Sequence, residues 1–131
     1  MNNMKLSKFQ FLNPYLEEIN FITNQNFNAD DENMDVQNAF NVQVRKSEDS
    51  NRANVSLTLK INDENKNAPF RLQITVASDF KWEDLDDDMV NTMLKLNAPA
   101  LLLGYMRPIV ANITNSSKFP VYNIPFVNFK N

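Results

Sequence analysis

Apolar and polar side chains alternate along the first half of the chain. The alternation is clear in four segments: 15–21, 36–45, 53–61 and 70–80. In the third segment, Val55, Leu57 and Leu59 fall on one side, and polar residues fall between them. Successive side chains of a strand point to opposite faces, so this period of two predicts four β-strands, each apolar on one face. The polar links KSEDSNR and NDENKNAP are short enough for antiparallel connections.

The pattern becomes helical after Trp82. Apolar residues then recur three or four positions apart, at Leu85, Met89, Met93 and Leu96. A second apolar run follows at Leu101–Ile113, where we expect Asn97 to cap a new helix and Pro99 to lie in its first turn. Strands first and helices last predict an α+β fold: a four-stranded antiparallel sheet covered on one face by carboxy-terminal helices.

Two features interrupt the last third of the chain. Pro108 lies inside the second helical run, four residues after Gly104, the only glycine, so we expect the helix to bend between them. The segment Phe119–Phe129 has too many prolines for a helix and is too apolar for a free tail. We expect this aromatic segment either to lie on its own domain or to bind a partner.

Composition narrows the function. With 131 residues the chain is long enough for one core, so we expect a single domain at 1–131, with a strand platform at 1–80 and a helix and aromatic loop at 81–131. The formal net charge of -3 argues against a nucleic-acid partner. Without cysteine there is no disulfide or thiolate zinc site, and without histidine the commonest general base and metal ligand are missing. We therefore expect no enzyme, no metal and no cofactor.

Two further readings concern the acidic cluster and the membrane. The cluster EDLDDD is expected to be a solvated amino end of a helix, favoured by the helix dipole, although its carboxylates could also hold a divalent cation. No apolar run is long enough to span a bilayer, and the amino terminus lacks the apolar core of a signal peptide. The expected location is the cytoplasm, without membrane insertion.

The apolar residues exceed what one sheet face and one helix can bury. The surplus predicts an oligomer interface or an exposed apolar groove, and its methionines and aromatic rings suit a surface that adapts to varied partners. The outer face of the strand at 53–61 is polar but lightly charged. This strand could therefore pair edge to edge with a second copy, and an ordinary solvated face is the equally good alternative.

A family resemblance rests on the last third of the sequence. Ala98-Pro99, Leu102 to Arg107, Phe119-Pro120 and Ile124 to Phe129 follow one another in an order that resembles the carboxy-terminal half of SecB, the bacterial protein-export chaperone family. In that family a helix with a Cys-Pro, a hydrophobic pair and a Pro-Tyr-Ala-Arg leads into a Phe-Pro-Pro loop and a Pro-Val-Asn-Phe. The matching residues here are Tyr105, Arg107, Phe119, Pro120, Val127, Asn128 and Phe129.

The resemblance implies a function. SecB proteins assemble as a dimer or a dimer of dimers, through helices and an edge strand. They hold unfolded, export-bound polypeptides in hydrophobic grooves without ATP or another cofactor, and pass them to SecA. Carried over by position, the groove in this chain would be lined by Phe40, Val42, Val44, Leu102, Tyr105, Phe119, Pro120, Tyr122 and Ile124.

The resemblance also has departures. The family continues beyond its Val-Asn-Phe with a helix that covers the groove and an acidic tail that contacts SecA, whereas this sequence stops at Lys130-Asn131. We therefore expect a more open groove, and SecA remains an open alternative among the partners. Two other functions also remain open. One is a SecB-fold module dedicated to a single partner, such as an antitoxin, and the other is a carrier of a small apolar ligand.

Overall fold

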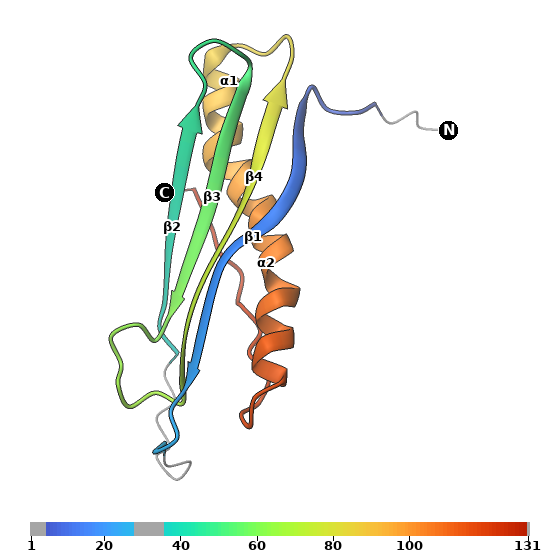
Figure 1. Cartoon of the computed structure of the whole chain (residues 1–131). Helices are drawn as coiled ribbons and strands as arrows, with labels where there is room; N and C mark the ends of the chain where they lie inside the picture. Colours follow the sequence, from blue (N-terminus) through green and yellow to red (C-terminus); the bar gives the residue numbers. More distant parts are fainter. Residues whose placement is uncertain (1–4, 28–35, 131) are drawn as a thin grey trace.

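The computed structural model describes residues 5–27 and 36–130, and within them it forms one antiparallel sheet followed by a helical arm (Figure 1). The strands are β1 (Phe9–Thr23), β2 (Asn38–Lys46), β3 (Arg52–Ile61) and β4 (Phe70–Trp82). The arm consists of α1 (Asp87–Thr92), the π-helical turn η1 (Met93–Asn97) and α2 (Ala98–Asn115). The predicted α+β fold, with a four-stranded antiparallel sheet and carboxy-terminal helices, is confirmed.

The strand order decides which strands have a free edge. The sheet runs β1–β4–β3–β2, so β2, β3 and β4 are consecutive neighbours and β1 joins last, on the far side of β4. Both edges of β3 are occupied, by β2 and by β4. The expectation that the strand at 53–61 pairs edge to edge with a second copy is therefore wrong, because its backbone groups already bond to two neighbours.

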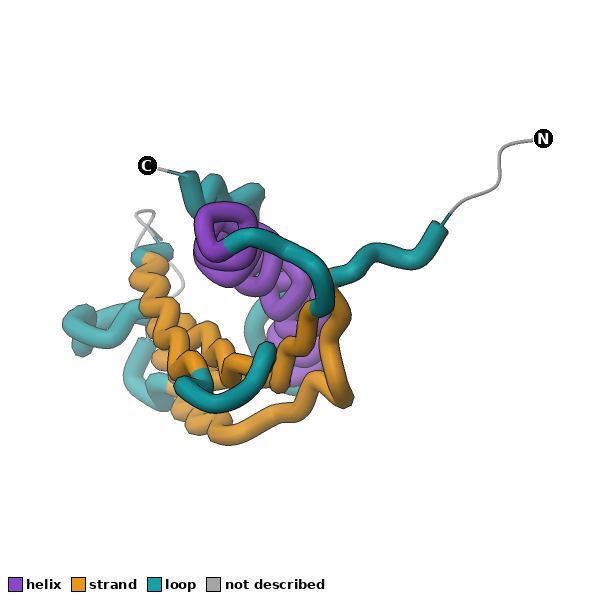
Figure 2. The backbone as a smooth tube through the Cα atoms, turned by 90° about the horizontal axis from the view of Figure 1, so that it is seen from above, coloured by secondary structure: helices purple, strands orange, loops and turns teal. Residues whose placement is uncertain are grey.

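The helical arm packs on one face of the sheet, and the two form two layers (Figure 2). Every second residue of β3 is buried, from Ala53 to Ile61, as the period of two predicts. The buried side of α2 meets these strands and includes Leu102, Met106 and Val110. On the opposite face of the sheet, the hydroxyls of Thr58 and Thr75 lie 2.7 Å apart. The apolar core thus lies between the sheet and the arm.

β1 is longer than the alternation predicts. It begins at Phe9 and continues through Asn13 and Pro14, where its pairing with β4 shifts register. Asn13 has a φ of 44°, in the left-handed region that asparagine tolerates better than most residues. A proline is acceptable here because β1 is an edge strand and its missing N–H can fall on the unpaired side.

The helical arm starts later than the sequence predicts. Trp82 still belongs to β4, where it pairs with Phe9, and the N-cap of the arm is Asp86. The carboxylate of Asp86 accepts the backbone N–H of Met89 at 2.8 Å. Leu85 continues the helical spacing but precedes this cap, so periodicity alone places the start too early.

Asn97 does not cap a second helix. Its backbone is helical and its side chain makes no capping bond, because the arm is continuous through η1 into α2. In η1 the N–H of Ala98 bonds to the carbonyl of Met93, five residues back. This wider turn ends two residues before Pro99, whose ring would press on the carbonyl of Lys95 in a regular α-helix. The π turn therefore accommodates a proline within one continuous arm.

The expected bend between Gly104 and Pro108 does not interrupt α2, which runs unbroken from Ala98 to Asn115. The departure from α-helical hydrogen bonding lies earlier, in η1. Gly104 is exposed, and a Cβ added there would meet no heavy atom within 4 Å.

Candidate functional site

The segment from Phe119 to Lys130, called here the C-terminal segment, contains neither helix nor strand. It turns back from the end of α2 and runs along the arm toward β2 (Figure 1). Tyr122, Val127 and Phe129 pack against the core, and Ile124 is part of it. Phe126 is fully exposed. The segment is therefore extended, with one side turned toward the domain and the other toward solvent.

Three side chains hold the C-terminal segment in place. The guanidinium of Arg107 donates to the carbonyls of Ile124 and Pro125, the latter at 2.9 Å, and lies 6.0 Å from the ring centroid of Phe126. The buried hydroxyl of Thr114 accepts the N–H of Tyr122 at 2.8 Å. The amide nitrogen of Asn38, in β2, donates to the Tyr122 hydroxyl at 2.7 Å.

Each of the hydrogen bonds that attach the C-terminal segment to the domain involves a side chain. Among the described residues, no backbone–backbone hydrogen bond joins the C-terminal segment to β2. The segment therefore lies beside the sheet without extending it.

A groove lies between β2 and the C-terminal segment. Its volume is about 580 Å³, and it is lined by Phe40, Val42, Val44, Lys95, Val127, Asn128 and Phe129. The ring of Phe129 stands edge-on to that of Phe40, with centroids 6.2 Å apart. We call this the β2 groove. Apolar side chains project from both walls, Lys95 is the one charged lining residue, and about half of the exposed lining surface is polar.

The structure brings only part of the predicted site together. Of the residues expected from sequence, Phe40, Val42 and Val44 line the β2 groove. Leu102 and Ile124 are buried in the core and do not line the groove.

The remaining predicted residues do not line the β2 groove. Tyr105 is 39% exposed on α2. Phe119 packs edge-on against Phe27, with centroids 5.5 Å apart, and Pro120 follows it in the turn after α2. Tyr122 lies between these residues and the groove, with its ring 6.3 Å from Phe70.

The sequence prediction did not include the second wall of the groove. Val127 and Phe129 face β2, and their alternating positions in an extended segment could have indicated a shared side. Lys95 could not have been found, because only the π turn fixes the direction in which η1 presents it.

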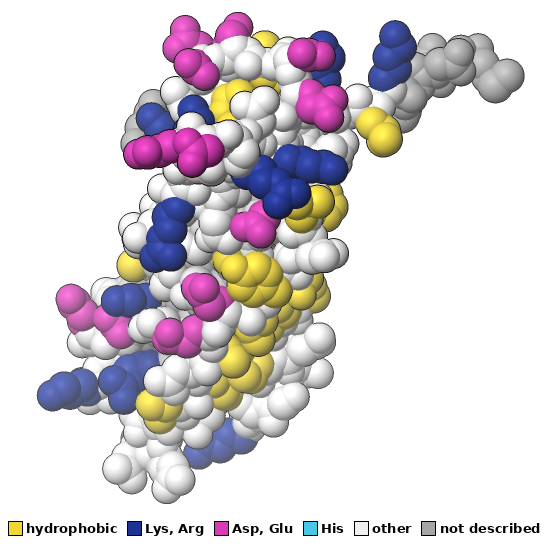
Figure 3. All heavy atoms as spheres, turned by 45° about the horizontal axis from the view of Figure 1, so that its top comes forward, with side chains coloured by type: hydrophobic (Ala, Val, Ile, Leu, Met, Phe, Trp, Pro, Cys, Tyr) yellow, Lys and Arg dark blue, Asp and Glu magenta, His cyan; other side chains and the backbone are white. Residues whose placement is uncertain are grey.

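Apolar side chains are also exposed on both faces of β1. Phe11, Tyr15, Leu16 and Ile22 are 41–46% exposed although all are large and apolar. In Figure 3 hydrophobic side chains form a band along one side of the visible face, with charged side chains beside it. The predicted surplus of apolar residues is therefore present at the surface, and β1 carries much of it.

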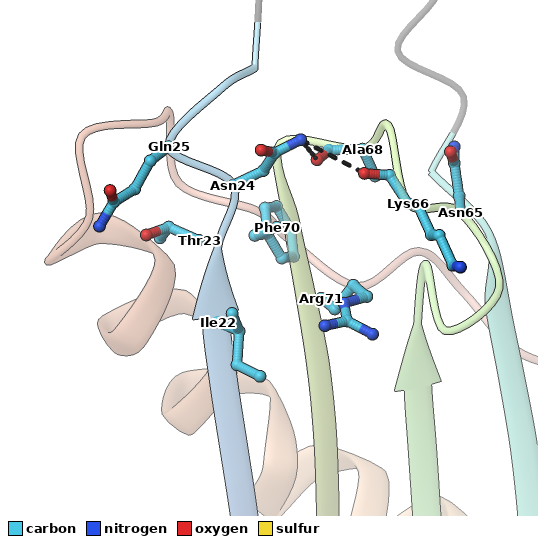
Figure 4. Close-up of a pocket in the computed structure, with 9 residues that line it drawn as sticks. All are labelled: Ile22, Thr23, Asn24, Gln25, Asn65, Lys66, Ala68, Phe70 and Arg71. Atoms are coloured by element: carbon cyan, nitrogen blue, oxygen red, sulfur yellow. Dashed lines mark hydrogen bonds between the residues drawn. The ribbon is translucent and has the colours of Figure 1, made fainter.

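A smaller recess, of about 280 Å³, lies where β1 ends and β4 begins. Asn24 ties its two loops together, since its N–H bonds to the carbonyl of Pro69 at 2.8 Å and its amide nitrogen to that of Ala68 at 3.1 Å. Figure 4 shows this amide reaching across to the loop before β4, with the side chains of Lys66 and Arg71 nearby. None of the predicted groove residues lines this recess.

The described residues also bear on two other possibilities, a metal site and a membrane-spanning helix. Within 5–27 and 36–130, no three acidic side chains come together in a way that could hold a metal ion. In the same part of the chain, no helix has the length and apolar character needed to cross a membrane.

Comparisons with known proteins agree with this architecture. The sequence model of the family described as preprotein translocase subunit SecB matches residues 2–131. The protein-export protein SecB of Cereibacter sphaeroides is 23% identical over 129 residues, which cover 93% of this chain and 78% of the relative. That of a Jannaschia species is 24% identical over 132 residues, covering 95% and 77%.

A solved structure shares the fold. It is the Mycobacterium tuberculosis Rv1957 SecB-like chaperone, in complex with a ChAD peptide from the Rv1956 HigA1 antitoxin. It superposes with a TM-score of 0.72 over 92% of this chain and 88% of the other, at 11% identity. Because the family model spans nearly the whole sequence and the fold agrees, this chain belongs to the SecB family of protein-export chaperones.

Proposed function

We propose that this protein is an ATP-independent holdase that captures unfolded, export-bound polypeptides in the β2 groove. The observation that carries the proposal is the groove itself: apolar walls from β2 and from an extended segment that side chains alone hold in place. Such a surface can take up apolar residues of many sequences, because burial of apolar area is not directional.

The proposed mechanism is capture by burial. Apolar side chains of a client lose contact with water against Phe40, Val42 and Val44 on one wall and against Val127 and Phe129 on the other. We propose that Phe119, Pro120 and Tyr122, and Tyr105 on α2, add further contacts outside the groove. Each contact is weak, and several along one client add by multivalency. No step requires nucleotide hydrolysis or covalent chemistry, so we propose a binding protein and not an enzyme.

We further propose that the protein acts in the cytoplasm as a homo-oligomer. The exposed apolar side chains of β1, which lie on both faces of this edge strand, support an interface between copies, since exposed large apolar side chains gathered on one element commonly mark such contacts. Whether a client then passes to SecA is a separate step that binding assays with SecA would test.

A second candidate is a module dedicated to one partner. One observation favours it: the structurally similar Mycobacterium tuberculosis protein was solved with a peptide from an antitoxin. A dedicated module would bind one such segment tightly and ignore generic unfolded proteins.

The test is suppression of aggregation without ATP. A chemically unfolded, slow-folding protein is diluted into buffer with increasing amounts of this protein, and light scattering is followed. We expect suppression near stoichiometric ratios. If the folded protein suppresses nothing even in excess, the general holdase is wrong and a dedicated partner is favoured.

A pair of variants locates the site. Val44 lines the β2 groove and is 37% exposed, whereas Leu6 is 90% exposed and lies outside the groove and the C-terminal segment. Val44→Ser should weaken suppression several-fold, and Leu6→Ser should leave it unchanged, although it removes a larger apolar side chain. Equal effects would place capture elsewhere on the molecule.

A further inference from the structure

The two free edges of the sheet differ in how well they can accept another strand. An edge strand presents a row of unpaired backbone N–H and C=O groups, and proteins commonly block such edges with bulges, prolines and charges. β1 carries these features: Pro14, two register shifts, and Glu17 and Glu18 near its middle. Its edge is irregular.

The edge of β2 is regular. From Asn38 to Lys46 it pairs residue for residue with β3, and it contains neither proline nor glycine. In the described part of the chain no other strand pairs with its second edge, and the C-terminal segment makes no backbone hydrogen bond to it. Nine consecutive residues therefore offer an uninterrupted edge.

This edge is continuous with the β2 groove. Phe40, Val42 and Val44 project from alternate positions of β2 into the groove. A strand placed beside β2 would point every second side chain to the same side, toward the apolar walls. The charged side chains of β2 and the groove are Arg45, Lys46 and Lys95, which are all cationic. Two of them lie at the carboxyl end of β2, which would face the amino end of an antiparallel strand.

We propose that a client segment binds by adding to β2 as a fifth, antiparallel strand. The segment has apolar residues at alternate positions and an acidic residue near its amino end. Its backbone bonds to the free edge of β2 while its apolar side chains fill the β2 groove. The inference rests on the proposed function and specifies its binding mode. Backbone pairing supplies affinity independent of sequence, and the groove selects segments that have apolar residues at alternate positions.

The test separates backbone pairing from apolar contact. The probe is a fluorescein-labelled nine-residue peptide with an amino-terminal aspartate followed by alternating valine and threonine, used at concentrations where it is monomeric. Two methylated versions carry N-methyl groups either on the valines or on the threonines. In an extended strand the N–H groups of alternate residues point to opposite edges, so only one version removes the donors that face β2.

We expect one methylated version to lose at least about tenfold in affinity, because each lost hydrogen bond costs about 0.5–1.5 kcal/mol. The other should bind within about threefold of the parent, since its methyl groups face away from β2. Each version is the matched control of the other, with the same side chains and a near-equal number of methyl groups. Binding of the parent peptide should also slow hydrogen exchange in β2.

Three results would overturn the inference. They are equal losses in both methylated versions, no loss in either, or no binding of the parent peptide by protein that still holds an unfolded client. Each of these results refutes strand addition without contradicting the holdase function. Failure to hold any unfolded client would instead refute the proposed function on which the inference rests.

Discussion

At the scale of single residues, Tyr122 does most to attach the C-terminal segment to the domain. Its backbone N–H bonds to Thr114 of α2, its hydroxyl accepts from Asn38 of β2, and its ring lies near Phe70 of β4. One tyrosine thus joins the arm, an edge strand and a central strand. The segment has few such anchors, so each carries a large share of its stability.

Removing the hydroxyl of Tyr122 should therefore be costly. Tyr122→Phe leaves the amide nitrogen of Asn38 without its acceptor, and the Oδ1 atom of Asn38 is already buried without a partner. We expect the free energy of unfolding to fall by about 1–3 kcal/mol, the cost of an unsatisfied buried group. Tyr105→Phe is the control, because Tyr105 is exposed on α2, and it should change stability by less than about 0.5 kcal/mol. Urea unfolding measures both, and equal effects would show that the Asn38 contact contributes nothing.

At the scale of elements, the helical arm is continuous although it contains one π-helical turn. A proline within a helix normally ends or bends it, yet α1, η1 and α2 form one arm, in which the π turn ends two residues before Pro99. Close packing does not require a glycine at position 104, since a Cβ added there would meet no heavy atom within 4 Å.

Gly104→Ala should therefore stabilise the protein. Alanine loses less backbone entropy than glycine on entering a helix, so we expect a gain of about 0.5–1 kcal/mol in the free energy of unfolding. The matched control is Ala100→Gly, at another exposed position of α2, which should lower stability by a similar amount. If Gly104→Ala destabilises the protein while Ala100→Gly behaves as expected, Gly104 is needed for the shape of the helix near Pro108.

The strands could be predicted from sequence better than the helix boundaries or the groove. The alternation in β3 reports directly on its two faces, and the predicted Ala53 start differs from the observed Arg52 by one residue. Leu85 and Asn97 misled the helix prediction because spacing and residue type resemble a helix start at both places, while the caps depend on Asp86 and the π turn. The second groove wall depends on contacts from Arg107 and Thr114. These join segments far apart in the sequence, which local patterns do not report.

At the scale of the whole molecule, the apolar surfaces separate into two regions. The two edge strands of the sheet are β2 and β1 (Figure 1). β2 lines the groove, and β1 carries the exposed apolar side chains. A protein that uses one surface for clients and the other for self-association can do both at once, because β3 and β4 stand between them.

Charges placed on β1 should therefore break an oligomer without abolishing capture. We expect the unmodified protein to be at least a dimer, and the double variant Leu16→Glu, Ile22→Glu to shift toward the monomer mass, since buried carboxylates facing one another would be costly. Val121→Glu is the control, an exposed apolar position away from β1. Light scattering coupled to size-exclusion chromatography reports the mass. A monomeric unmodified protein, or an equal shift in the control, would refute an interface on β1.

The position of β1 in the sheet has a consequence for synthesis of the chain. β1 is the first strand to leave the ribosome, yet its partner is β4, and Phe9 pairs with Trp82. The strands β2, β3 and β4 can associate through short links as soon as they emerge, whereas β1 must wait for all of them and then close the longest loop of the sheet. Throughout that interval its apolar side chains have no strand to pair with, and such exposed segments are prone to aggregate. The growing chain thus passes through the same unprotected condition as the polypeptides that its family holds for export.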